Sequence, residues 1–276
     1  MSDDHEHAVA RHYQVSALTE RVLKAAAVAG LDIDRLTPDD LGPIDEFHIG
    51  GRAATKQLVA KMHLAGTEHV LDIGCGIGGA ARYVAASTGC RVTGIDLTPE
   101  YIETARALSQ RTGLGGRTMF EVGSALRMPF ADAMFDAATT LHVAMNIKDR
   151  AGLYRESARV LKRGAVLCIY DVMKGKNDGL IYPVPWAETP ASSHLTTPED
   201  MRALLADAGF SVEEVEDRTE FGIAFFRERL SAGGPPSPLG LHLLMGETSR
   251  QKFQNMLRNL EQGFVAPVTM IARCAA

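Results

Sequence analysis

Two titratable side chains stand where the sequence predicts the ends of neighbouring apolar strands. His142 follows the run from 134 to 141, and Asp171 lies near the end of the run from 165 to 172. Because the carboxyl ends of parallel strands share one edge of a sheet, we expect both side chains at one cleft. An imidazole with an ordinary pKa of about 6.5 suits proton removal close to neutrality. A carboxylate beside it suits binding of an ammonium group or polarisation of a hydroxyl.

Each of these residues also has a purely structural interpretation. His142 would then only hydrogen-bond a bound cofactor or a neighbouring backbone group, and Asp171 would cap or anchor a loop. Asn146 follows His142 by four residues, and its amide cannot serve as a base because it does not titrate. We expect Asn146 to orient or bind a ligand, or to cap the helix that follows.

Tyr13, His48 and the only tryptophan, Trp186, are further candidate contacts for a small-molecule acceptor. An aromatic face stabilises a cationic amine by about 0.5–2 kcal/mol. An isolated aromatic residue in a loop can equally be simply packed, and His48 can make a structural hydrogen bond. The apolar runs 225–226 and 241–245 are expected to form the core of a helical insert rather than a substrate face.

The segment from 70 to 79, Val-Leu-Asp-Ile-Gly-Cys-Gly-Ile-Gly-Gly, predicts the element that positions these groups. A short apolar run with one acid is followed by a glycine at every second residue and then by a helix-like run. This pattern indicates a buried strand, a tight turn and a helix whose free N–H groups face the turn. Such a turn lets a nucleoside-bearing ligand approach the backbone of Gly74, Cys75 and Gly76.

Two acids bear on the choice of cofactor: Asp96 suits both a nicotinamide and a sulfonium cofactor, and Asp72 distinguishes between them. Asp96 ends the next predicted strand, where a carboxylate accepts hydrogen bonds from both hydroxyls of a ribose. Asp72 lies in the strand just before the glycines, where it would repel a pyrophosphate. S-adenosylmethionine has no phosphate, and its amino group and sulfonium are both positive. Asp72 therefore favours S-adenosylmethionine, either directly or through water.

The rest of the chain is expected to place this turn inside an α/β domain. Short apolar runs alternate with helical periods from about residue 67 to 217, which is typical of a parallel sheet covered by helices. Gly164 should end a helix over 150–162, and the last strand should start after Pro267. The other strands are predicted at 69–73, 91–97, 118–123, 134–141, 165–172 and 210–217.

Two helical regions lie outside this alternation. Residues 1–66 predict an N-terminal helical cap, and residues 67–276 predict the ligand-binding domain. A helical insert at about 219–263, broken at 233–238, precedes the last strand. Helices in these positions would lie over the carboxyl ends of the parallel strands, where ligands bind in such sheets, and would cover the acceptor.

Taken in order, these motifs resemble the class I S-adenosylmethionine-dependent methyltransferases over about residues 45–220. The resemblance is to the small-molecule branch, which includes sarcosine/dimethylglycine, phosphoethanolamine and quinone-biosynthesis methyltransferases. It implies a doubly wound seven-stranded sheet, mostly parallel, with an antiparallel last strand. The motifs that carry it are the glycine-rich turn, Gly94-Ile95-Asp96, 123–130, Phe135-Asp136, 47–51, 141–147 and 170–172.

The resemblance also implies roles for residues around the turn. Gly74 and Gly76 would offer backbone contacts to the methionine part of the cofactor. Cys75 lies between them as a small residue in a tight turn. Asp96 would hold the ribose, and Leu97 would pack on the adenine.

Further roles follow for the loops at the cleft. Ser124 and Ala125 lie after the third strand, where the family usually has an Asp-Ala pair that reads the adenine amino group. Ser124 departs from that pattern, and a hydroxyl accepts a hydrogen bond more weakly than a charged carboxylate does. Leu141, His142 and the Gly50-Gly51 pair would enclose the sulfonium and carboxylate ends.

Bulk composition excludes several classes of protein. The chain has 276 residues, 46% hydrophobic and 23% charged, which is typical of one large globular α/β domain with a small cap. Its net charge of −5 gives no overall attraction to nucleic acid or to an anionic membrane. No apolar run approaches the roughly 20 residues of a membrane span, and the polar start is unlike a signal peptide. Four scattered cysteines lack metal-site spacing, so we expect no metal and a cytoplasmic setting.

These observations predict methyl transfer from S-adenosylmethionine to a small molecule, at an amine or at a hydroxyl or carbon centre. A base is needed only if the nucleophile must lose a proton. Two alternatives stay open: a non-catalytic S-adenosylmethionine-binding protein shares the cofactor motifs, and a nicotinamide-dependent oxidoreductase shares the turn and Asp96. The expected partner is the small-molecule acceptor, and the prediction allows for a homodimer.

Overall fold

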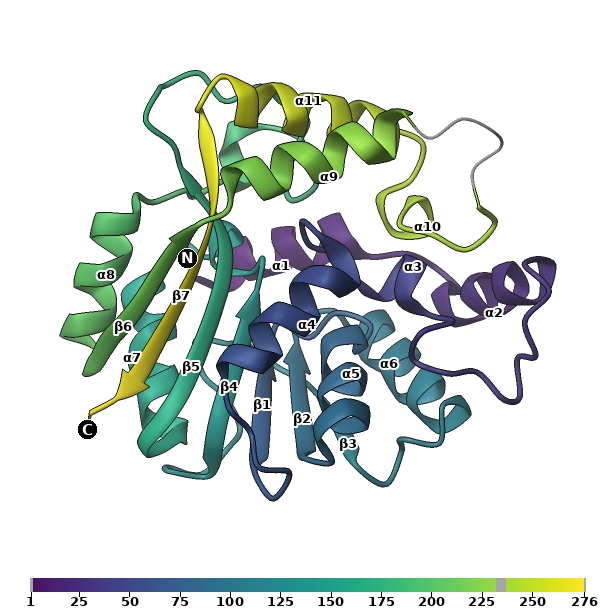
Figure 1. Cartoon of the computed structure of the whole chain (residues 1–276), viewed down its shortest axis with the longest axis horizontal. Helices are drawn as coiled ribbons and strands as arrows, with labels where there is room; N and C mark the ends of the chain where they lie inside the picture. Colours follow the sequence, from purple (N-terminus) through teal and green to yellow (C-terminus); the bar gives the residue numbers. More distant parts are fainter. Residues whose placement is uncertain (1, 232–236, 276) are drawn as a thin grey trace.

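A seven-stranded sheet forms the centre of the computed structural model, which describes residues 2–231 and 237–275 (Figure 1). The strand order across the sheet is β3-β2-β1-β4-β5-β7-β6. The strands are β1 His69–Ile73, β2 Arg91–Asp96, β3 Thr118–Val122, β4 Phe135–Leu141, β5 Leu161–Lys174, β6 Phe210–Asp217 and β7 Val265–Cys274.

Strand directions confirm the predicted topology. β1 pairs in parallel with β2 and β4, and the parallel pairing continues to β3 on one side and β5 on the other. β7 is antiparallel to both of its neighbours, β5 and β6. The strand order reverses between β1 and β4, and open α/β sheets bind ligands at such a switch point. The fold is therefore doubly wound with an antiparallel last strand.

Helices cover both faces of the sheet and its carboxyl-end edge. Buried side chains of α4, α5 and α6 pack in one core cluster, and those of α7 and α8 pack in another on the opposite face. The helices are α1 Ser2–Tyr13, α2 Leu18–Val28, α3 Gly42–Asp45, α4 Gly51–Lys61, α5 Gly79–Thr88, α6 Pro99–Arg111, α7 Arg150–Val160, α8 Pro198–Asp207, α9 Thr219–Ser231, α10 His242–Met245 and α11 Ser249–Glu261, with short 3-10 turns at Ala144–Asn146 and Pro190–Ser192.

Two predicted boundaries are wrong. β5 starts directly after α7, so Gly164 (φ 79°) lies inside the strand rather than after a helix. The pairing of β5 with β4 shifts register there, and a glycine at positive φ suits such an irregularity as well as it suits a helix end. β7 starts two residues before Pro267 rather than after it. A proline is tolerated at this position because β6 pairing begins only at Val268, so β7 has one neighbour there.

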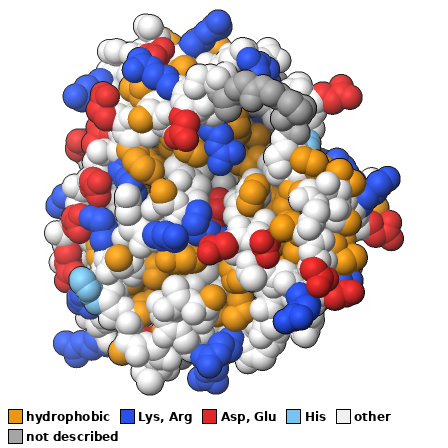
Figure 2. Space-filling view, turned by 45° about the vertical axis from the view of Figure 1, so that its right-hand side comes forward, with side chains coloured by type: hydrophobic (Ala, Val, Ile, Leu, Met, Phe, Trp, Pro, Cys, Tyr) orange, Lys and Arg blue, Asp and Glu red, His pale blue; other side chains and the backbone are white. Residues whose placement is uncertain are grey.

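The helices outside the alternation lie along the carboxyl-end edge of the sheet. In Figure 1, α9 and α11 cross above this edge, with α10 beside them and α1 below. Residues 233–236 of the predicted break lie outside the described residues, and the chain from 237 leads to α10. Figure 2 shows a hollow on this side of the molecule, with hydrophobic side chains gathered along it and charged ones at its border. Among the described residues, no helix is both long and apolar enough for a membrane span.

Candidate functional site

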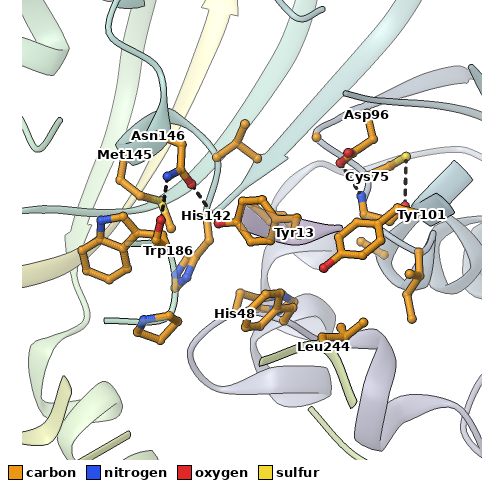
Figure 3. Close-up of a pocket in the computed structure, with 18 of the residues that line it drawn as sticks. Tyr13, His48, Cys75, Asp96, Tyr101, His142, Met145, Asn146, Trp186 and Leu244 are labelled. Carbon is orange, nitrogen blue, oxygen red and sulfur yellow. Dashed lines mark hydrogen bonds between the residues drawn. The ribbon is translucent and has the colours of Figure 1, made fainter. Parts of the chain in front are cut away.

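A cavity of about 180 Å³ opens at the carboxyl ends of β1, β2 and β4. Figure 3 shows Tyr13 in its middle, with His142 and Trp186 on one side and Asp96 and Tyr101 on the other. The structure brings most of the predicted site residues to this one space. Those that line it are Tyr13, His48, Asp72, Gly74, Cys75, Gly76, Asp96, Leu97, Ala125, Leu141, His142, Asn146 and Trp186.

The glycine-rich turn forms the floor between β1 and α5. The N–H of Gly74 donates to the carbonyl of Ile95 at 2.8 Å, and the N–H of Gly76 donates to Oδ2 of Asp96 at 3.0 Å. Gly74 has a φ of 71°, and a Cβ there would lie 2.5 Å from Val143. At Gly76 (φ 53°) a Cβ would meet no atom within 4 Å. At Gly76 the turn therefore presents bare backbone to open space, as close approach of a nucleoside ligand requires.

Asp96 lies beside this turn at the end of β2. Its Oδ1 accepts the N–H of Thr98 at 2.9 Å, and burial raises the pKa of the carboxyl above its usual value. Each carboxylate oxygen has two lone pairs, so Asp96 keeps capacity to accept from ligand hydroxyl groups. The residue fits the ribose-binding role that its position predicted.

Asp72 lies beneath the turn, 3% exposed. Thr139 donates its hydroxyl to Oδ1 at 2.8 Å, while Oδ2 has no hydrogen-bond partner among the described residues. Burial raises the pKa of Asp72 to about 7, and the bond from Thr139 opposes this shift. A positive ligand group near the cavity would favour the charged form of Asp72, whereas a phosphate would oppose it.

Cys75 is buried between the two glycines. Burial raises the pKa of its thiol well above the usual value, and the carboxylate of Asp96 adds to the effect. The thiol therefore stays protonated, and Cys75 acts by its small size rather than as a nucleophile.

His142 follows β4 with its side chain facing the cavity. The backbone N–H of His142 donates to the carbonyl of Tyr170 at 2.7 Å, and the residue has a φ of 56°. Nε2 is buried and has no hydrogen-bond partner among the described residues. Burial lowers the pKa of the imidazole well below 6.5, and His48 lowers it further. The ring is therefore neutral near pH 7, with an imidazole nitrogen available to a bound ligand.

His48 faces His142 across the cavity, with ring centroids 6.0 Å apart. Thr55 of α4 donates its hydroxyl to Oε2 of Glu46 at 2.6 Å, so its oxygen can only accept from Nε2 of His48, at 3.0 Å. The guanidinium of Arg52 lies 2.7 Å from Oε1 of Glu46. Burial lowers the pKa of His48 to about 4, so this ring is also neutral. Sequence reasoning missed the Glu46–Thr55 support, because its residues are ordinary helix and loop types with no motif.

Asn146 connects three segments that enclose the cavity (Figure 3). Its Oδ1 accepts the hydroxyl of Tyr13 at 2.9 Å, and its Nδ2 donates to the carbonyl of Trp186 at 2.9 Å. The indole of Trp186 is 2% exposed and donates to Oγ of Ser193 at 3.0 Å. The Asn146 side chain therefore ties α1 to the loop that carries Trp186, rather than capping a helix.

Four predicted site residues, Gly50, Gly51, Ser124 and Asp171, do not line the cavity. Gly51 begins α4, and its neighbour there is Glu46. Ser124 donates its hydroxyl to Oε1 of Glu6 in α1. Asp171 lies on the opposite face of β5 from Tyr170, because side chains alternate along a strand.

Asp171 instead supports the loop that carries His142. Burial raises the pKa of its carboxyl to about 7, and Arg150 and the nearby backbone N–H groups of Ala144 and Met145 oppose this shift. The N–H of Val172 donates to Oδ1 at 3.2 Å, and Oδ2 has no hydrogen-bond partner among the described residues. This environment of the Asp171 carboxyl favours a role in anchoring the loop over contact with a substrate.

Replacing Asp171 with alanine is therefore expected to lower the free energy of unfolding by about 1–3 kcal/mol, because buried N–H groups lose their acceptor. Urea unfolding followed by circular dichroism measures this. An Asp171→Ala protein as stable as the wild type, yet unable to bind a substrate, would contradict the anchoring role.

Apolar side chains of the insert form the roof of the cavity. Phe225 and Phe226 of α9, Leu244 of α10, and Phe253 and Met256 of α11 all line it. The runs 225–226 and 241–245 therefore pack in core clusters, as expected, and also line the cavity. The spacing of apolar residues in these helices predicted that one face of each helix is buried. It did not predict that this face lies against the cavity.

Comparison with known proteins gives the following similarities. A family model described as "Methyltransferase domain" matches residues 71–169. Methyltransferase GfsG of Streptomyces halstedii is 31% identical over 184 residues, which are 66% of this chain and 66% of the relative. O-methyltransferase resE of Aspergillus sclerotiorum is 28% identical over 186 residues, 65% of this chain and 68% of the relative. The chain thus spans about two thirds of the length of these relatives.

Solved structures share the fold. Geranyl diphosphate C-methyltransferase from Streptomyces coelicolor A3(2) superposes with a TM-score of 0.72 at 18% identity, covering 98% of this chain and 97% of that one. A sarcosine dimethylglycine methyltransferase, described as putative, from Galdieria sulphuraria gives a TM-score of 0.69 at 17% identity, covering 85% and 94%. At these identities the likeness concerns the fold alone.

Proposed function

Since the chain belongs to the class I S-adenosylmethionine-dependent methyltransferases that act on small molecules, we propose that it methylates a hydroxyl group of a bulky, largely apolar molecule. S-adenosylmethionine is the methyl donor. The comparisons do not favour a non-catalytic binding protein or a nicotinamide-dependent oxidoreductase.

One observation carries the choice of a hydroxyl acceptor. Nε2 of His142 is buried without a hydrogen-bond partner among the described residues, and the ring is neutral near pH 7. Leaving a buried polar atom unpaired costs about 1–3 kcal/mol, so such an atom in a cavity calls for a ligand group to pair with it. A hydroxyl donates to a neutral imidazole nitrogen and can lose its proton to it.

The roof of the cavity supports an apolar acceptor. Its aromatic and aliphatic side chains carry no charge, and the charged residues that line the cavity, Asp45, Asp72 and Asp96, lie near the glycine-rich turn. Asp171, the carboxylate first considered for an ammonium acceptor, lies on the other face of β5. These features favour a neutral acceptor over an amine.

The residues would act as follows. S-adenosylmethionine, when bound, would supply an electrophilic methyl group on a neutral thioether leaving group. Asp96 and the turn at Gly74 and Gly76 hold the nucleoside and the methionine part. His142 takes the hydroxyl proton on Nε2, and His48, held by Thr55, orients the acceptor. Positioning of this kind is worth about 7–11 kcal/mol in favourable cases, so the shape of the cavity matters as much as the base.

Helices outside the sheet would serve as covers in this scheme. Residues 1–66 form an N-terminal cap, residues 67–276 the catalytic domain, and the insert at 219–263 the lid over the acceptor. Three of the cysteines, Cys75, Cys90 and Cys168, are free thiols buried in the described chain, which supports the proposal of a cytoplasmic enzyme.

A screen with methyl-labelled S-adenosylmethionine tests the proposal. Neutral phenols, hydroxylated polyketides and terpene alcohols are compared with matched amines, and products are identified by mass spectrometry and NMR. We expect O-methylated products from apolar alcohols or phenols. Turnover of amines alone would contradict the hydroxyl assignment while leaving the methyltransferase assignment intact.

A further inference from the structure

The N-terminal helix α1 presents one stripe of side chains to the cavity. Val9 and Tyr13 line it, whereas Glu6, which precedes them at helical spacing on the same face of α1, lies just outside the lining residues. Tyr13 reaches Asn146 in the middle of the cavity, 2.9 Å away. Glu6 extends the stripe toward the loop that follows β3.

Glu6 meets that loop at Ser124. The serine hydroxyl donates to Oε1 of Glu6 and accepts the N–H of Leu126 at 3.0 Å. The two residues on either side of Ser124, Gly123 and Ala125, both line the cavity. A carboxylate from the first helix therefore stands next to the cavity wall, about 118 residues away in sequence from the serine that it contacts.

We expect the adenine of a bound cofactor to lie next to this part of the cavity wall. The reactive methyl group must face the acceptor chamber at His142, and Asp96 next to the glycine-rich turn takes the ribose. The base must then lie beyond Asp96, on the side away from His142. Figure 3 places Tyr101 on this side, and the cavity-lining residues in the segments that follow β2 and β3 are Leu97, Thr98, Tyr101 and Ala125.

Resting on the proposed cofactor assignment, we propose that Glu6 is the residue that recognises the 6-amino group of the adenine. An exocyclic amino group is a hydrogen-bond donor, and a carboxylate accepts from it about twice as strongly as a neutral oxygen does. Ser124 cannot supply that charge, and its hydroxyl proton is already directed at Glu6. The first helix thus contributes to cofactor selection as well as covering the cavity.

A different role for the same contact is a tether that holds α1 against the domain. A second tether exists nearby, where Nε2 of Gln14 donates to Oε1 of Glu100 at 2.8 Å. A tether strengthens binding of any nucleoside that α1 covers, whereas a carboxylate that reads the base distinguishes an amino group from a carbonyl. Gln14→Ala is therefore a matched control for loss of tethering.

Isothermal titration calorimetry of the full chain with S-adenosylhomocysteine and S-inosylhomocysteine separates the two roles. The inosine analogue carries a carbonyl at the position of the amino group. Wild type is expected to prefer the adenosine ligand. Glu6→Ala should weaken binding of that ligand about tenfold or more and remove the preference. Glu6→Gln, whose amide can donate to the carbonyl, should shift the preference toward the inosine ligand, and Gln14→Ala should leave it unchanged.

Equal weakening of both ligands by Glu6→Ala, or an unchanged preference, would overturn the proposal and leave only the tether. Wild-type protein that binds neither nucleoside would overturn the cofactor assignment itself, and this inference with it. Helical content measured by circular dichroism checks that the variants remain folded.

Discussion

Replacing His142 with asparagine is expected to lower kcat by about 10²–10⁴-fold on a hydroxyl acceptor, the usual contribution of a general base. Asparagine tolerates the left-handed backbone of this position (φ 56°) better than alanine does, so the fold is preserved. Its amide has no basic nitrogen to take the proton. Affinity for S-adenosylhomocysteine should fall far less than kcat does, because the variant leaves the glycine-rich turn and Asp96 intact.

The pH dependence follows from the lowered pKa of His142. The form that acts as base is unprotonated, and burial keeps it unprotonated down to pH values well below 6.5. We expect kcat to stay flat between about pH 6.5 and 8 and to fall only under more acidic conditions. The free energy of unfolding depends on pH in the same direction as kcat. Below about pH 6.5, His142 of the unfolded chain binds a proton that His142 of the folded chain does not, so the free energy of unfolding falls as the pH is lowered.

Exposed His63 provides the control, since it also has a positive φ (51°) and does not line the cavity. His63→Asn should leave kcat and its pH profile unchanged. If His142→Asn turned over the acceptor at the wild-type rate, His142 would not be the base. A profile that halves near pH 6.5 would indicate a histidine of ordinary pKa instead.

Replacing Asp96 with asparagine is expected to weaken S-adenosylhomocysteine binding by about ten- to a hundredfold. Hydrogen bonds to a charged acceptor contribute about 1.5–3 kcal/mol, and the amide replaces one accepting oxygen with a donor. The remaining oxygen still accepts one of the N–H groups, from Gly76 or Thr98, that Asp96 binds now. Calorimetric titration measures the change.

Asp207→Asn on α8 is the matched control, because Asp207 is exposed and lies outside the cavity lining. Titration with NADH completes the experiment, and we expect no binding. Unaltered S-adenosylhomocysteine affinity in Asp96→Asn would remove this residue from the ribose role.

The central turn could be predicted from sequence because its signal is local. Glycine at alternate positions after an apolar run indicates a strand, a turn and a helix, and β1, the turn and α5 follow at 69–88. Asp96 could be placed because it ends the next parallel strand. These features depend on contacts between segments close in the chain.

The features that sequence reasoning missed depend on contacts between distant segments. Glu6 meets Ser124 across 118 residues, and no local pattern in α1 predicts that pairing. The orientation of Asp171, by contrast, could have been predicted from the sequence. Side chains alternate along β5, so that Tyr170 and Val172 lie in one core cluster and Met173 lies in the other. This alternation alone predicts that the side chain of Asp171 points to the face of the sheet away from the cavity.

A crystal structure of the full chain with S-adenosylhomocysteine tests the central claim most directly. We expect the ribose hydroxyls on Asp96, the methionine part along the turn at Gly74 and Gly76, and the sulfur facing His142. A nucleoside bound elsewhere, with the turn left free, would contradict the account.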